Sequence, residues 1–89
     1  MKNNGQQAKQ DYVGTVQWFR DNLGYGFIEC SNFPKAVFVH YSRIMTNEEF
    51  KTLSKGQIVT FQVAETVKGY MATNVRENKI LHSTAIIVS

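Results

Sequence analysis

The sequence predicts an all-β domain folded as a small five-stranded antiparallel barrel, followed by a C-terminal extension. From Tyr12 onward, short runs rich in Val, Ile, Phe, Tyr and Thr alternate with Gly, Asn, Asp and Pro, the pattern of strands and turns. Five short strands joined by one long connection favour a closed or nearly closed barrel, because closure removes the edges that a small lone sheet would leave exposed. The 89 residues suffice for one domain.

The strands are expected at residues 12–20, 24–30, 36–41, 57–66 and 70–77. The connection between the third and fourth strands, residues 42–55, has a different texture. Its first part, 42–45, suits one short helical turn. Thr46 and Glu49 have the spacing of a capping box, so residues 46–50 are expected to form either a capped helical turn or a loop.

The two ends of the chain differ from the domain at 12–76. Residues 1–11 are polar and without periodicity, which predicts a flexible N-terminal arm. Residues 77–89 form a C-terminal extension that contains the apolar, strand-prone run 84–88. Such a run could pack on the barrel or pair with another chain. We therefore expect a monomer, with self-association through this apolar tail as the alternative.

Composition excludes several classes of protein. A single cysteine, Cys30, allows no intramolecular disulfide and, with two distant histidines, no Cys/His zinc site, so neither a metal nor another cofactor is expected. No apolar run suits a signal peptide or a membrane-spanning helix, which favours a cytoplasmic protein with no membrane partner. The net charge of +3 is compatible with a polyanionic partner without requiring one.

Alternation along two strands separates aliphatic side chains from rings. Successive side chains of a strand point to opposite faces. Over 25–28 and 37–40, one face therefore carries Gly26, Ile28, Val37 and Val39, and the other carries Tyr25, Phe27, Phe38 and His40. The aliphatic set is the better core because it has no polar atoms to satisfy. The rings are then expected outside, where a cluster of exposed rings usually marks a binding surface.

The expected interior of the barrel is aliphatic with one ring. It comprises Val16, Ile28, Val37, Val39, Val59, Phe61, Val63 and Val75. The first strand conflicts with simple alternation, because an inward Val16 also turns Trp18 inward. A bulge near Gln17 and Trp18 would resolve the conflict.

Three ordered motifs resemble one known family. They are Gly14-Thr15-Val16-Gln17-Trp18-Phe19, Gly24-Tyr25-Gly26-Phe27-Ile28 and Val37-Phe38-Val39-His40-Tyr41-Ser42, and they resemble the cold-shock domain of bacterial cold-shock proteins and Y-box proteins. The similarity covers roughly residues 12–76. It implies an OB-fold barrel that binds single-stranded RNA or DNA with low sequence specificity, as an RNA chaperone or a modulator of transcription or translation.

The resemblance also implies which residues meet the nucleic acid. By matching positions, bases stack on Trp18, Tyr25, Phe27, Phe38, His40 and Phe50, Phe19 and Tyr41 flank them, and Lys68 contacts the backbone. Two departures lie at Gln17 and Leu23, where relatives usually carry a basic residue or, at Leu23, a basic or polar one. Arg20 and Arg43 are expected to compensate for the missing charge, and Tyr70 to add a further stacking ring. Binding should therefore depend more on stacking and less on salt.

Two other classes of function fit the sequence less well, an enzyme and a protein-binding barrel. Nucleophilic catalysis needs an activated side chain beside a positioned base, and Cys30 and His40 are expected at opposite ends of their hairpin. No carboxylate pair falls within the aromatic stripes, and the sequence has no Gly-rich phosphate loop, so we expect no enzyme. A barrel that binds another protein through its rings or its tail is the remaining alternative.

Overall fold

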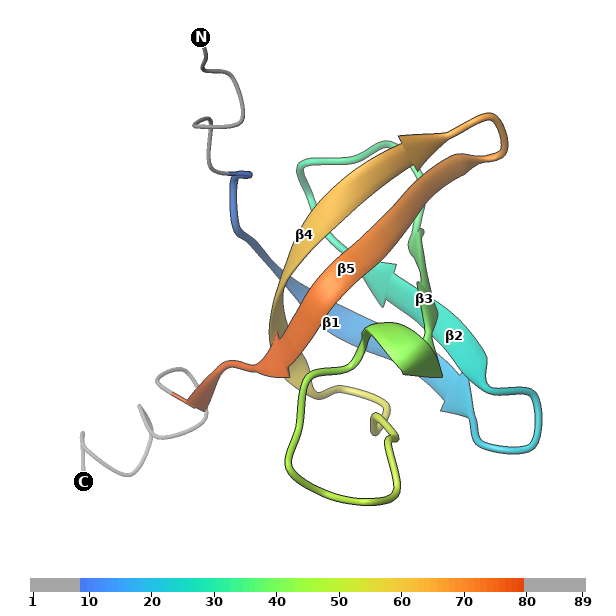
Figure 1. The fold of residues 1–89 in the computed structure, drawn as a ribbon. Coiled ribbons are helices and arrows are strands. Elements are labelled where there is room, and N and C mark those ends of the chain that lie inside the picture. Colours follow the sequence, from blue (N-terminus) through green and yellow to red (C-terminus); the bar gives the residue numbers. More distant parts are fainter. Residues whose placement is uncertain (1–8, 80–89) are drawn as a thin grey trace, which may run out of the picture.

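The computed structural model describes residues 9–79 and folds them into a closed five-stranded barrel, which confirms the predicted all-β class (Figure 1). The strands are β1 (Tyr12–Arg20), β2 (Tyr25–Glu29), β3 (Val37–His40), β4 (Ile58–Thr66) and β5 (Gly69–Glu77). A 3-10 turn, η2 (Tyr41–Arg43), follows β3. The predicted N-terminal arm up to residue 8 and the apolar run 84–88 lie outside the described residues.

The strands follow one another round the barrel in the order β1-β2-β3-β5-β4. Four neighbouring pairs are antiparallel, but β3 and β5 run parallel, with Phe38 opposite Met71. The predicted antiparallel pairing is thus found at every junction between neighbouring strands except this one. The reason is geometric, since a closed ring with an odd number of strands cannot alternate in direction at every step.

A bulge in β1 confirms the predicted solution to the Trp18 conflict. Val16 pairs with Ile28, and Trp18 pairs with Phe27, the adjacent residue of β2. Gln17 is therefore an extra residue of β1 that is not matched by a residue of β2. Val16 is buried, whereas Gln17 is exposed and Trp18 is half-buried. The bulge thus keeps Val16 in the core while Trp18, two residues later, reaches the outer surface.

The core inside the barrel is nearly the predicted one. Seven of the expected residues are at most 1% exposed: Val16, Ile28, Val37, Val39, Val59, Phe61 and Val75. Val63 is the exception, because it lies toward the β4–β5 hairpin and is only partly buried against the core. Four further buried side chains complete the core: Cys30 directly after β2, Ile44 and Leu53 in the connection, and Ala72 within β5.

Gly26 marks the place where β2 comes closest to β1. A Cβ atom there would lie 2.1 Å from the carbonyl oxygen of Trp18 and 2.7 Å from Cα of Phe19. Only glycine leaves room for this approach. The close contact sets the position of the two neighbouring rings on β2, Tyr25 and Phe27, relative to Trp18.

The long connection after β3 is mostly irregular. The predicted short helical turn appears as η2, one residue earlier than expected, and residues 46–50 adopt the loop alternative. Thr46 Oγ1 accepts a hydrogen bond from the N–H of Glu48 at 3.1 Å without starting a helix. The connection is joined to the barrel where the N–H of Met45 donates to the carbonyl of Val75 at 2.7 Å.

Within residues 9–79 there is no helix of the length and apolarity needed to cross a membrane.

Candidate nucleic-acid interface

Five side chains from three adjacent strands form one outward surface, which we call the ring face: Trp18, Tyr25, Phe27, Phe38 and His40. All five are half-buried. The strand register places Phe27 opposite Phe38 and Tyr25 opposite His40. The structure therefore brings together the four residues chosen from alternation and adds Trp18 through the bulge.

Four rings of this face, those of Trp18, Tyr25, Phe27 and Phe38, contact one another in a closed circuit. The centroid of Trp18 lies 5.9 Å from that of Tyr25 and 5.4 Å from that of Phe27. Phe38 completes the circuit at 5.5 Å from Tyr25 and 5.8 Å from Phe27. These separations are typical of favourable aromatic pairs. The rings hold one another in place and still present exposed edges and faces to solvent.

His40 is oriented by the turn that follows it. The N–H of Ser42 donates to Nδ1 of His40 at 3.3 Å, and the hydroxyl of Ser42 lies 2.8 Å from the same nitrogen. An accepting Nδ1 places the proton of the neutral imidazole on Nε2. His40 can then offer a ring face for stacking and an N–H donor at Nε2.

A second apolar surface continues the ring face beyond His40. The rings of His40 and Tyr41 lie 4.6 Å apart, and Tyr41 lines a groove of about 440 Å³ with Phe19, Leu23 and Phe50. Tyr41 is 48% exposed and Phe50 is 64% exposed. Phe19, Tyr41 and Phe50, which the resemblance implied, are thus brought to the edge of the ring face.

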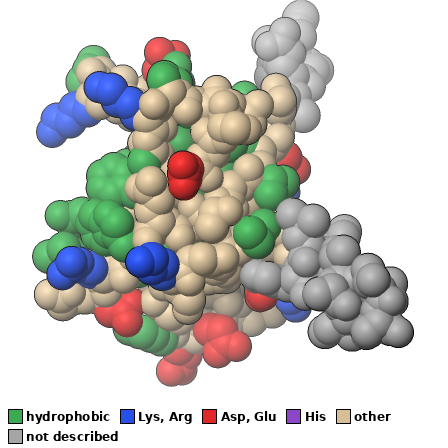
Figure 2. Space-filling model, turned by 180° about the vertical axis from the view of Figure 1, so that it is seen from behind, with side chains coloured by type: hydrophobic (Ala, Val, Ile, Leu, Met, Phe, Trp, Pro, Cys, Tyr) green, Lys and Arg blue, Asp and Glu red, His purple; other side chains and the backbone are tan. Residues whose placement is uncertain are grey.

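The cations that border these surfaces include Lys51, which lines the groove beside Phe50. The guanidinium carbon of Arg20 lies 5.6 Å from the ring centroid of Trp18, within reach of a cation–π contact. Lys68 is exposed in the turn between β4 and β5. Gln17 and Leu23 are exposed and uncharged. From behind, hydrophobic side chains gather in a patch along one side of the molecule, with Lys and Arg side chains above and below it (Figure 2).

Tyr70 does not join the ring face. Its ring lies 4.9 Å from that of Phe33, which in turn lies 4.8 Å from that of Tyr12. These three rings, which we call the end cluster, pack against the core. Tyr70 shares its side of β5 with the buried Ala72, two residues later. That alternation in sequence is the signal that would have placed Tyr70 inward.

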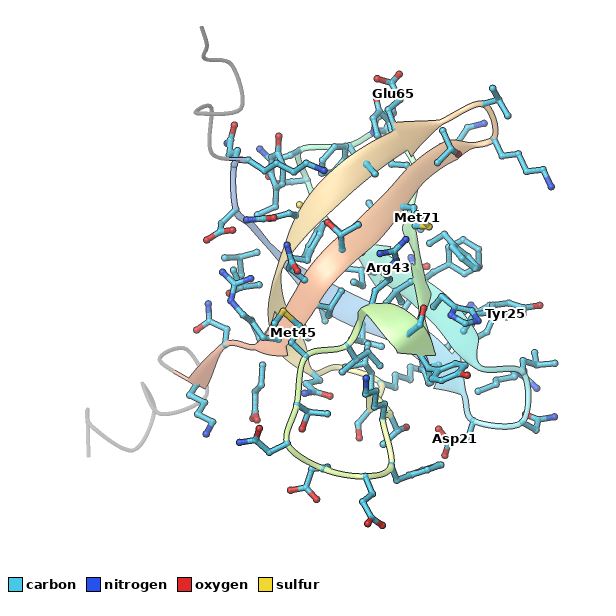
Figure 3. All side chains as sticks on the ribbon, viewed as in Figure 1. Asp21, Tyr25, Arg43, Met45, Glu65 and Met71 are labelled. Carbon is cyan, nitrogen blue, oxygen red and sulfur yellow. The ribbon has the colours of Figure 1, made fainter. Side chains whose placement is uncertain are left out.

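Met71 is a candidate contact residue that the sequence reasoning missed. It is half-buried and pairs with Phe38 across the parallel seam. Because Ala72 is buried, alternation places its neighbour Met71 on the outside of β5. The pairing with β3 could not be read from the sequence. Figure 3 shows Met71 and Arg43 on the side of the barrel that carries Tyr25.

The strand order and the ring face together define a class of protein. A closed five-stranded barrel with partly exposed rings on β1, β2 and β3 is an OB-fold with an aromatic surface. Among residues 9–79, no group of three or more potential metal ligands gathers in one place.

Comparison with known proteins agrees with this class. The family model described as the 'Cold-shock' DNA-binding domain matches residues 12–78. The cold shock-like protein of Aquifex aeolicus is 52% identical over 65 residues, which are 73% of this chain and 91% of that protein. Cold shock-like protein CspA of Shewanella violacea is 48% identical over 63 residues, 71% of this chain and 89% of that protein.

The chain belongs to the cold-shock domain family. The match supports nucleic-acid binding of the cold-shock type. A solved structure, drosophila Unr CSD456, shares the fold with a TM-score of 0.64 at 19% identity. That alignment covers 80% of this chain and 28% of the other.

Proposed function

We propose that the chain binds single-stranded RNA or DNA by stacking unpaired bases on the ring face, with low sequence specificity. The observation that carries the proposal is the circuit of four rings, Trp18, Tyr25, Phe27 and Phe38, held on adjacent strands of a closed barrel. Every base has a π-face, so a stacking surface accepts all of them. The site is built on strands, so binding requires little reordering of the backbone.

Stacking supplies most of the binding energy in this proposal. Each base on an aromatic ring contributes about 1–3 kcal/mol by alanine substitution. Several such platforms give useful affinity after the cost of ordering the strand is subtracted. The groove at Phe19, Tyr41 and Phe50 extends the same surface and would hold a further base.

Electrostatics plays the smaller part. Arg20 and Lys68 are the cationic contacts in this proposal, and Gln17 and Leu23 contribute no charge. Each phosphate contact adds about 0.7 to the slope of log affinity against log salt for single strands. We therefore expect a shallow salt dependence.

Binding of this kind opens nucleic-acid hairpins without ATP. The ring face takes only unpaired bases, so the protein shifts the population of a marginal hairpin toward its open strand. This is the basis for proposing an RNA chaperone or a modulator of transcription or translation. The protein would act as a non-enzymatic monomer in the cytoplasm, on nucleic acid rather than on membranes.

Tryptophan fluorescence tests the proposal directly, because Trp18 is the only tryptophan of the chain. Heptamers of uridine or thymidine should quench it strongly, with modest weakening as salt is raised. A fluorophore–quencher hairpin should open on addition of the protein without nucleotide. Absence of quenching at low salt would overturn the proposal and favour a protein-binding barrel.

A further inference from the structure

A polar groove adjoins the ring face at the β1 bulge. It has a volume of about 430 Å³, and its walls include Thr15, Gln17, Glu29 and Lys35. Gln17 is the extra residue of the bulge and the neighbour of Trp18. Glu29 is paired with Thr15 across β1 and β2. The groove therefore begins where the aromatic surface ends.

Strand geometry places the Glu29 carboxylate beside the stacking surface. Glu29 follows Phe27 by two residues on β2, so the two side chains share a face and lie about 6–7 Å apart along the strand. That separation is comparable with the width of a base. A base stacked on Phe27 or Trp18 can therefore direct its hydrogen-bonding edge toward Glu29 and Gln17.

Both polar groups are available for a ligand. Within residues 9–79, neither the Gln17 amide nor the Glu29 carboxylate has a hydrogen-bond or ion-pair partner, and both side chains are exposed. The carboxylate only accepts hydrogen bonds, while the amide both donates and accepts. Lys35, on the wall of the same groove, only donates.

This donor and acceptor pattern matches one base best. Guanine presents two adjacent donors, N1–H and the N2 amino group, beside the acceptor O6. A carboxylate can accept from both donors at once, and the Gln17 amide or the Lys35 ammonium can donate to O6. Uracil and thymine place carbonyl oxygens on both sides of their single N–H, which a carboxylate repels. Adenine and cytosine offer one donor beside a ring acceptor.

We propose that Glu29 and Gln17 form a base-reading site that favours guanine at the position stacked against Trp18 and Phe27. This inference rests on the proposed function, because the base must first stack on the ring face. Overall specificity stays low, since a single position of the bound strand is read. The discrimination between guanine and uracil at that position should be about tenfold in affinity, within the range for one good bidentate contact.

The test uses the full chain and uridine heptamers in which one guanosine occupies each position in turn. Trp18 fluorescence should show one position at which guanosine strengthens binding about tenfold over uridine. Inosine, which lacks the N2 amino group, should recover only part of the gain at that position. A second series, with adenosine in place of guanosine at each position, shows how much of the gain comes from the stronger stacking of any purine and how much from hydrogen bonding to guanine.

Glu29→Gln supplies the decisive variant, and Glu65→Gln is its matched control. Glu65 is also exposed but lies on β4, paired with Tyr70 (Figure 3). Glu29→Gln should abolish the guanosine preference and leave the affinity for plain uridine heptamer unchanged or higher, whereas Glu65→Gln should change neither. Equal guanosine preference in both variants would overturn the base-reading site while leaving the stacking function intact. Failure of every heptamer to bind would overturn the stacking function as well.

Discussion

Thr52 Oγ1 donates a hydrogen bond of 2.5 Å to Oδ1 of Asp21, across 31 residues of sequence. Asp21 lies in the turn between β1 and β2 (Figure 3), and Thr52 lies in the long connection that carries Phe50. Asp21 lines the groove formed by Phe19, Tyr41 and Phe50, and Thr52 follows its lining residues Phe50 and Lys51 by two and one positions, so the bond ties two segments of the groove together. A surface hydrogen bond is thus placed where it can hold an exposed ring in reach of the ligand.

Asp21→Ala should weaken binding of a uridine heptamer about two- to threefold, since a net hydrogen bond is worth about 0.5–1.5 kcal/mol and its loss frees Phe50 to move. Titration of Trp18 fluorescence measures the change. Thr46→Ala is the control, because its hydrogen bond stays within the same connection. Equal affinities for Asp21→Ala and the unmodified chain would mean that the bond has no part in binding.

Phe38→Ala should lower affinity for the heptamer at least tenfold and leave the fold intact. Phe38 contacts two other rings of the circuit, so its removal deletes one platform and loosens two more. Phe61→Ala is the contrasting variant, because Phe61 is fully buried and its truncation should cost about 3–5 kcal/mol of stability. If thermal unfolding shows the same loss in both variants, Phe38 belongs to the core and not to the binding surface.

Leu23→Lys should steepen the salt dependence of binding by about 0.7 in the slope of log affinity against log salt. Leu23 is 46% exposed in the groove beside Tyr41, where a cation can reach the phosphate backbone. Val13→Lys is a close control, since Val13 is also 46% exposed but pairs with β4. Fluorescence titrations at several salt concentrations give the slope of log affinity against log salt for each variant. An equal slope for Leu23→Lys and Val13→Lys would show that no phosphate passes near Leu23.

Tyr70→Ala should lower the free energy of unfolding by about 1–2 kcal/mol and leave the affinity for the heptamer nearly unchanged. The end cluster with Phe33 and Tyr12 supplies the physical reason, because Tyr70 packs there and not on the ring face. Denaturant unfolding and fluorescence titration give the two quantities. A severalfold loss of affinity without a loss of stability would instead assign Tyr70 to the binding surface.

Local alternation was enough to predict much of the ring face and most of the core. Tyr25, Phe27, Phe38 and His40 lie on two strands of regular period, so their common face follows from the sequence alone. The position of Trp18 needed a bulge, which the conflict in alternation placed near Gln17 and Trp18, and the pairing with β2 identifies Gln17 as the extra residue.

Long-range pairing was the part that sequence could not supply. The parallel seam that sets Met71 beside Phe38 joins segments more than thirty residues apart. Tyr70 was expected to stack on a ligand, yet its ring packs on Phe33, which lies in the loop between β2 and β3. Alternation with Ala72 gives the side of β5 that carries Tyr70, but the ring that it meets there depends on how the barrel closes.

The bulge at Gln17 has a consequence for how the first strand tolerates changes of length. Deleting Gln17 would restore uninterrupted alternation, with Val16 still inward and Trp18, now its direct neighbour, still outward opposite Phe27. The barrel could then keep both its lining and its ring circuit. Deleting a paired residue of β1 beside the bulge would instead turn the side chains on one side of the deletion to the opposite face. The strand therefore has one position at which a residue can be lost without exchanging its inner and outer side chains.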